Sequence, residues 1–272
     1  MSQSNLTSII ISTCDEKLLG KTMESCVSAA AGPIEFVIGF DGCSDLLPRS
    51  RSFNGINIIE HREPNQIGRR KMINRLQRMA NGEYFYQVDA HCAMSKQWDV
   101  NLKKVAGKDG YAASIIVNLF RGMVHVYKHI CLTFPDLRNE LWEERPILYN
   151  GEPMPVYYGC SCLYHRDLAF DYNESYSGWG WMGVELGLRA WLCGAKPNPV
   201  RLCHTAAVTH VSRRHRGSNE RIGWKDNLMS PRQTSFHLTN LYKNMKAPDQ
   251  QRTVDWLISK FPVMPGWEEG IL

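Results

Sequence analysis

An aspartate and a histidine stand two residues apart directly after an apolar segment. Residues 84–88 have the composition of a buried strand, and Asp89 and His91 follow in the stretch YQVDAHCAMSKQW. Residues two apart in an extended segment project from the same side, so the two side chains can meet at one point. A carboxylate with an imidazole suits a divalent ion such as Mn²⁺, with open positions left for phosphate oxygens. The pattern predicts a metal site, and a hydrogen-bonded loop histidine is the alternative.

The segments around this pair alternate between strands and helices. Apolar residues at helical spacing predict helices, and β-branched or aromatic runs predict strands. The N-terminal order is strand, helix, strand, strand, helix, strand, over residues 8–12, 17–31, 35–40, 56–60, 69–80 and 84–88. This order is typical of an α/β domain with a mostly parallel sheet. Ligands bind beyond the carboxyl ends of such strands, so Thr13, Asp41 and Asp89 should line one crevice.

The rest of the chain is less regular. We expect strands at 112–120, 156–164 and 206–211, a charged loop at 137–151 and a helix at 183–191. Two amphipathic helices are expected near 235–245 and 249–261. The simplest organisation is one domain over residues 1–232, followed by a short helical C-terminal extension over 233–272.

Composition excludes several classes of protein. The 272 residues are 43% hydrophobic and 22% charged, as in ordinary soluble globular proteins. No apolar run approaches the ~18 residues of a membrane-spanning helix, and the N-terminus has no secretory signal pattern. The nine cysteines form no CxxC pair, which favours reduced thiols over a disulfide framework or a structural zinc site. These features lead us to expect a cytoplasmic protein.

A basic segment lies between Arg201 and Arg232. It holds seven Lys/Arg and two acidic residues, and so accounts for the whole formal net charge of +5. A solvated loop is one explanation. The other is an anionic ligand, such as a diphosphate or a nucleic acid.

Six segments resemble, in the correct order, motifs of the GT-A glycosyltransferases, in particular the polypeptide N-acetylgalactosaminyltransferases and family 2-like bacterial and viral relatives. They are SIIISTCDEKLLGKTMESC, EFVIGFDGCSD, GRRKMINRL, YFYQVDAHCAMSKQW, SGWGWMGVELGLRAWLCG and THVSRRH. The resemblance implies a Rossmann-like, mixed and mostly parallel sheet flanked by helices. It also implies a nucleotide-sugar-binding half at 1–106, an acceptor-binding half at 107–232, and metal-dependent transfer of a sugar from a UDP-sugar to an acceptor hydroxyl.

The resemblance further implies roles for single residues. Asp89 and His91 match the D-x-H metal ligands, and His210 matches the third ligand, for Mn²⁺ or Mg²⁺. Residues that match contacts to the uridine and ribose, or that position the metal-motif loop, are Thr13, Asp41 and Arg69. Apart from the resemblance, Trp179 has a flat aromatic face suited to stacking on the sugar, with an ordinary core role as the alternative, and Gly180 allows close backbone approach to the ligand. Residues on the loop that covers the diphosphate, where they can stabilise the leaving group, are Arg213 and His215.

Glu185 is the candidate on the acceptor side. Its segment departs from the W-G-G-E-N-x-E motif of the family, because Met182 stands in place of the first glutamate. In another register the segment looks like the W-G-W-G-G-E-D-D motif of β-1,4-galactosyltransferases, in which Glu185 matches the carboxylate that deprotonates the acceptor. The two families have opposite stereochemical outcomes, so retention and inversion both stay open. Glu185 is then a general base, an orienting residue, or a salt-bridge partner within its own helix.

Three hypotheses describe what the chain does. In the first, it glycosylates a hydroxyl of a saccharide, peptide or small molecule. In the second, the acceptor is a hydroxymethylated pyrimidine in DNA, contacted by the basic segment from Arg201 to Arg232. In the third, the chain binds a nucleotide sugar without catalysis. The intact set of Asp89, His91 and His210 argues against the third hypothesis, and Met182 argues weakly for it.

Overall fold

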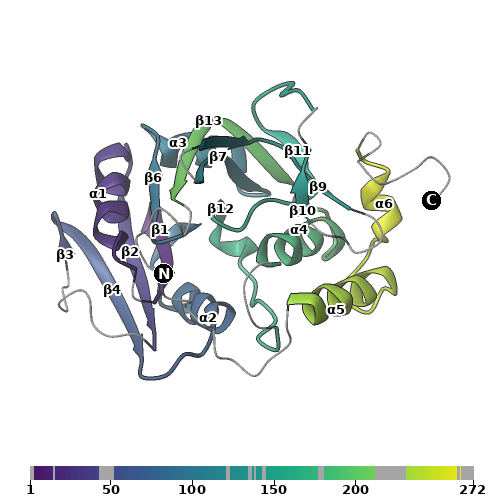
Figure 1. Cartoon of the computed structure of the whole chain (residues 1–272), viewed down its shortest axis with the longest axis horizontal. Coiled ribbons are helices and arrows are strands. Elements are labelled where there is room, and N and C mark those ends of the chain that lie inside the picture. Colours follow the sequence, from purple (N-terminus) through teal and green to yellow (C-terminus); the bar gives the residue numbers. More distant parts are fainter. Residues whose placement is uncertain are drawn as a thin grey trace.

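Helices cover a large mixed β-sheet in the computed structural model of the chain (Figure 1). The structure describes residues 3–14, 16–42, 52–120, 123–133, 137, 139–142, 145–176, 181–211, 231–261 and 264. The elements up to α3 are β1 (Gln3–Thr13), α1 (Leu19–Ala29), β2 (Ile34–Asp41), β3 (Ser52–Phe53), β4 (Ile56–Glu63), α2 (Arg69–Met79), β5 (Gly82–Val88), β6 (Cys92–Met94) and α3 (Trp98–Ala106).

The second half of the chain adds further strands and helices. They are β7 (Tyr111–Phe120), β8 (Met123–Tyr127), β9 (Ile130–Leu132), β10 (Asn139–Leu141), β11 (Glu152–Met154), β12 (Ser161–His165), the 3-10 turn η1 (Arg166–Leu168), α4 (Met182–Leu192), β13 (Val200–Val211), α5 (Pro231–Lys243) and α6 (Val254–Ile258). The sheet order is β11-β13-β7-β12-β5-β1-β2-β4-β3, with β6 beside β13 and β8 beside β7. β9 and β10 form a separate antiparallel pair.

The strands and helices predicted in the N-terminal half are present in the predicted order, and β3, β6 and α3 are additional elements that were not predicted. β5, β1, β2 and β4 are mutually parallel neighbours, and β7 and β13 form a further parallel pair. The apolar run of β1 is buried on both faces: Ile9 and Ile11 join the core under α1, and Ile10 joins the core under α2. The two helices therefore cover opposite faces of the sheet, as in a Rossmann-like fold. The predicted α/β class is confirmed.

The carboxyl ends of these parallel strands lie at one edge of the sheet. Thr13, the last residue of β1, is in register with Phe40 on β2, so Asp41 follows one position later. β5 ends at Val88, where Ser161 pairs with it from the antiparallel strand β12. Residues 13, 41 and 89 therefore stand at neighbouring strand ends, as the sequence predicts.

The predicted strand at 156–164 is wrong in its first half, since β12 begins only at Ser161. Residues 155–158 instead run against helix α4. A Cβ atom on Gly183 would lie 2.0 Å from the carbonyl oxygen of Tyr157, and one on Gly187 would lie 2.7 Å from that of Pro155. These two glycines of α4, one helical turn apart, have no side chain to keep the backbone of residues 155–158 away from the helix. This segment therefore packs on α4 instead of pairing as a strand.

The C-terminal helices share a core with α4 and β9. Leu238 and Tyr242 of α5 and Leu257 of α6 belong to one apolar cluster with residues of α4 and β9. The α4 and β9 residues of this cluster include Val184, Leu188 and Ile130. In Figure 1, α5 and α6 lie at the opposite end of the molecule from β3 and β4. α6 is shorter than the predicted helix at 249–261, and the predicted loop at 137–151 contains the short strand β10.

Two expectations from composition can be compared with the described part of the chain. Its cysteines all carry free thiols. No helix among the described residues combines the length and the apolar character that crossing a membrane requires.

Candidate functional site

Strand pairing brings the two halves of the candidate metal site together. After β5, the backbone N–H of Asp89 donates to the carbonyl of Cys160 at 3.3 Å, and a turn leads through His91 into β6. β6 pairs with β13 so that Cys92 lies opposite His210. The N–H of Val211 also donates to the carbonyl of His91, at 3.1 Å. His210 therefore reaches the strand end although it lies far away in the sequence.

The side chains of Asp89, His91 and His210 converge on one point. The Nε2 atoms of the two histidines are 2.9 Å apart. Oδ2 of Asp89 is 3.7 Å from Nε2 of His91 and 3.5 Å from Nε2 of His210. All three residues are partly buried, and their ligand atoms lie within 4.8 Å of one another. The arrangement can hold a metal ion.

The three atoms have the spacing that a first-row divalent ion needs. A point equidistant from the two Nε2 atoms and Oδ2 lies about 2.0 Å from each, which is close to the roughly 2.0–2.2 Å of metal bonds to imidazole nitrogen and carboxylate oxygen. One carboxylate and two imidazoles form a mixed set of ligands of intermediate hardness. Three ligands also leave coordination positions for other groups.

Arg69 holds the second oxygen of Asp89. Its Nη2 lies 2.5 Å from Oδ1 and also donates to the carbonyl of Gly159 at 3.3 Å. Burial raises the pKa of the Asp89 carboxyl, but Arg69 and the two histidines lower that pKa by more, so it lies well below its usual range. Asp89 is therefore an anion with Oδ1 fixed by Arg69 and Oδ2 turned toward the histidines.

The other two strand-end residues are also buried. Asp41 is fully buried, and its oxygens accept hydrogen bonds from the backbone N–H groups of Ile67 at 2.7 Å and Gly68 at 3.0 Å. These bonds fix the loop that leads into α2, and therefore the position of Arg69 at the start of that helix. Thr13 is 4% exposed at the end of β1. The structure thus brings the predicted donor-side residues to one edge of the sheet.

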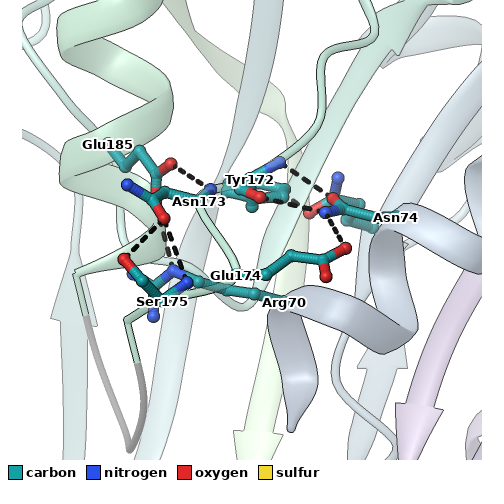
Figure 2. A network of polar contacts seen from close by, with 8 residues as sticks. Arg70, Asn74, Tyr172, Asn173, Glu174, Ser175 and Glu185 are labelled. Atoms are coloured by element: carbon teal, nitrogen blue, oxygen red, sulfur yellow. Dashed lines mark hydrogen bonds and ion pairs between the residues drawn. The ribbon is translucent and has the colours of Figure 1, made fainter. Parts of the chain in front are cut away.

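Glu185 belongs to a buried polar network (Figure 2). Its Oε2 accepts from Nε of Arg70 at 3.1 Å, and its Oε1 accepts from the backbone N–H of Asn173 at 2.7 Å. Asn74 of α2 bonds both the N–H and the carbonyl of Tyr172, at 2.8 and 2.9 Å. The network links α2 to α4 and to the segment that precedes α4. Burial raises the pKa of the Glu185 carboxyl, while Arg70 and Asn173 act in the opposite direction.

Two residues that the sequence analysis did not single out face the histidines. Oε2 of Glu16 lies 3.2 Å from Nδ1 of His91, and Oδ1 of Asn118 lies 3.1 Å from Nδ1 of His210. Glu16 lies three residues after β1 and Asp89 directly follows β5, so a position shortly after a strand end is the signal that could have identified Glu16. Asn118 lies within β7 beside His210, so only the register of β7 and β13 identifies it.

Four predicted site residues lie outside the described residues: Trp179, Gly180, Arg213 and His215. Most of the basic segment lies there too. Its first member, Arg201, is used inside the protein. Nη1 of Arg201 donates to the carbonyls of Val105 and Ala106 at the C-terminal end of α3, and it pairs with Asp109 at 3.1 Å. The described residues give no support for DNA as the acceptor.

The comparisons with known proteins agree with this architecture. The model of glycosyl transferase family 2 matches residues 8–171, which is more than half of the chain. No curated protein matches the sequence. The crystal structure of GalNAc-T7 with UDP, GalNAc and Mn²⁺ is similar over 88% of this chain and 49% of that chain, with a TM-score of 0.67 and 16% identity.

A second structural relative comes from S. aureus. The crystal structure of TarS residues 1–349 is similar over 78% of this chain and 60% of that chain, with a TM-score of 0.51 and 14% identity. The same part of TarS in complex with UDP gives a TM-score of 0.50, with 14% identity over 78% of this chain and 61% of that one. The chain thus spans about half to three fifths of the length of these structures. It has the GT-A fold and belongs to glycosyl transferase family 2.

Proposed function

We propose that the chain is a metal-dependent glycosyltransferase that moves a sugar from a UDP-sugar to an acceptor hydroxyl. Asp89, His91 and His210 hold the ion, which is Mn²⁺ or Mg²⁺. The observation that carries this proposal is the convergence of Oδ2 and the two Nε2 atoms at the carboxyl edge of a family 2 sheet. Ligands bind at this edge in open α/β sheets.

A departing diphosphate needs positive charge beside it, and we propose that the metal ion and the segment after His210 supply this charge. A divalent ion held by Asp89, His91 and His210 would offset the negative charge of the diphosphate. Arg69 fixes the carboxylate of Asp89, so the ligand oxygen has little freedom to reorganise during the reaction. We propose that Arg213 and His215 contact the diphosphate from the segment that follows His210, and that Trp179 and Gly180 contact the sugar.

The choice of UDP is supported by the structural relatives. GalNAc-T7 was solved with UDP, GalNAc and Mn²⁺, and TarS was solved with UDP. The low identities limit this likeness to the fold, so the donor is tested directly. Thr13 and Asp41 are the residues that we propose for the nucleotide end of the crevice.

Glu185 has two possible roles on the acceptor side, and the structure bears on both. A raised pKa is in the direction that suits a general base. However, both oxygens already accept bonds from Arg70 and Asn173, so a base would have to exchange one of these bonds for the acceptor hydroxyl. The contacts favour a positioning role, in which Glu185 holds the segment before α4 against α2.

A donor screen tests the proposed function. The protein is incubated with UDP-glucose, UDP-GlcNAc, UDP-galactose and UDP-GalNAc, together with saccharide, peptide and small-molecule hydroxyl acceptors, and the release of UDP is measured with Mn²⁺, with Mg²⁺ and with EDTA. We expect release from at least one donor that depends on the metal and is absent in His210→Ala. Equal release in EDTA would contradict metal dependence, and no release from any UDP-sugar would contradict the donor class.

A further inference from the structure

The two histidines of the site face each other through the same ring atom. Their Nε2 atoms are 2.9 Å apart, and the rings meet edge to face with centroids 4.6 Å apart. A neutral imidazole carries one N–H and one lone pair. If both protons reside on Nδ1, two nitrogen lone pairs point toward one small volume, an arrangement that a cation stabilises. The groups that face the two Nδ1 atoms therefore decide what the pair can bind.

Glu16 faces Nδ1 of His91. Its Oε2 lies 3.2 Å from that nitrogen, and its side chain is only 8% exposed. Its other oxygen, Oε1, accepts a hydrogen bond of 3.2 Å from the backbone N–H of Leu18, immediately before α1. A carboxylate at this distance attracts a proton on Nδ1 and repels a lone pair there. Glu16 therefore favours the tautomer of His91 that has its proton on Nδ1 and a lone pair on Nε2, the atom that can bind a metal.

Asn118 has the equivalent place beside His210. Its Oδ1 lies 3.1 Å from Nδ1 of His210, and its Nδ2 donates to the hydroxyl of Tyr127 at 3.1 Å. The bond to Tyr127 turns the amide oxygen, which accepts only, toward the histidine. Asn118 and His210 are also direct cross-strand neighbours on β7 and β13. The strand register and the hydrogen bond to Tyr127 thus together fix the hydrogen-bond acceptor, Oδ1 of Asn118, beside Nδ1 of His210.

We propose that Glu16 and Asn118 are positioning residues that set the tautomer and the ring orientation of the two histidine ligands. Each residue faces the Nδ1 atom of its histidine, whereas the convergence point is faced by Nε2, so each acts through its histidine. The inference rests on the proposed metal-dependent function. It adds two residues that surround the metal ligands: the charged Glu16, from the loop between β1 and α1, and the neutral Asn118, from β7.

Binding of Mn²⁺ in the presence of UDP tests this proposal without measuring turnover. Free Mn²⁺ is followed by electron paramagnetic resonance for wild type, Glu16→Ala and Asn118→Ala. We expect the Kd for Mn²⁺ to rise about 10–100-fold in each variant, which is the usual effect of losing an outer partner of a histidine ligand. The free energy of unfolding is measured without metal in parallel. A loss of stability with an unchanged Kd would mean a structural role and would overturn the inference.

Conservative variants and a matched control sharpen the test. Glu16→Gln keeps an oxygen for Leu18 but removes the charge beside His91, so the protein should fold while the Kd still rises. Asn118→Asp keeps an acceptor oxygen, so its Kd should stay close to that of wild type, and a Kd as poor as that of Asn118→Ala would contradict the proposal. Glu24→Ala makes the same charge change as Glu16→Ala at an exposed position of α1 and should bind as wild type does.

The outcomes also separate this inference from the proposed function. If wild type itself binds no Mn²⁺ with UDP, the metal-dependent function fails. If wild type binds Mn²⁺ and both alanine variants bind it equally well, only the assignment of Glu16 and Asn118 fails.

Discussion

Arg70 on α2 and Glu185 on α4 form an ion pair of 3.1 Å between two side chains that are 4% and 3% exposed. The pair joins positions 115 residues apart and lies across the boundary between the predicted donor and acceptor halves. Because Asn173 also donates to Glu185, the carboxylate connects three segments. These contacts hold Asn173 and α4 against the helix that begins with Arg69.

The first prediction concerns the stability of this pair. Arg70→Met and Glu185→Gln each leave one member of a buried pair without its partner, and each should lower the free energy of unfolding by about 3–5 kcal/mol. The double variant Arg70→Met/Glu185→Gln should lose less than the sum of the two, because it leaves no unpaired buried charge. Urea denaturation measures all three values, and strictly additive losses would contradict the coupling.

The same variants separate the two roles of Glu185. If Glu185 is a positioning residue, Arg70→Met and Glu185→Gln should reduce sugar transfer by similar factors, since both disturb one network. Transfer is measured below the unfolding temperature of both variants, together with the affinity for UDP. Transfer abolished in Glu185→Gln but nearly retained in Arg70→Met, with UDP binding intact in both, would instead identify Glu185 as the general base.

A third prediction concerns Arg69 and Asp89 and the dependence of stability on pH. In wild type the pKa of Asp89 is depressed, so its contribution to stability is present above the unfolded pKa of about 3.9 and is lost as the pH falls below that value. In Arg69→Met, Asp89 stays buried but loses the guanidinium beside it, so the ionised form of Asp89 becomes less favourable. The stability difference between wild type and variant should therefore widen as the pH rises from 4 to 7, in metal-free buffer.

Arg78→Met is the matched control for this prediction. It makes the same change on the same helix, but the pair between Arg78 and Asp171 is exposed. Such pairs contribute about 0–1 kcal/mol. The difference between Arg78→Met and wild type should stay small and nearly constant over the same pH range. If the stability difference between wild type and Arg69→Met also stayed constant over this pH range, Arg69 would not be the residue that stabilises the Asp89 anion.

A fourth prediction concerns Arg201. Its guanidinium donates to two carbonyls at the C-terminal end of α3, so Arg201→Met should lower the free energy of unfolding by about 1.5–3 kcal/mol, as expected for lost bonds to a charged group. The loss should be seen equally in the presence and absence of DNA. If instead DNA stabilised wild type but not Arg201→Met, the basic segment would bind nucleic acid.

The strand ends were predictable from the sequence because apolar runs and the polar residues that follow them are local features. Asp89 and His91 were found in this way, and Thr13 and Asp41 follow the same rule. His210 required a resemblance to a family, since its approach to His91 depends on pairing between β6 and β13. That pairing joins segments whose sequences give no sign of it.

The contacts around these residues were not predictable, for a physical reason. The partners of Asp89, Glu185 and His210 depend on packing between helices and on cross-strand register, which no local pattern encodes. The error at residues 156–160 has the same origin. Its β-branched and aromatic composition favours a strand, but the close approach of helix α4 at Gly183 places this backbone elsewhere.

Binding of UDP, with and without Mn²⁺, to wild type and Asp89→Ala by titration calorimetry tests the central claim most directly. Asp89 provides the only carboxylate in the cluster formed with His91 and His210 within the described part of the chain. We predict that wild type binds UDP much more tightly with Mn²⁺ than without it, and that Asp89→Ala loses this difference while remaining folded. Equal UDP binding with and without Mn²⁺ in wild type, or a metal effect that survives in Asp89→Ala, would contradict the account.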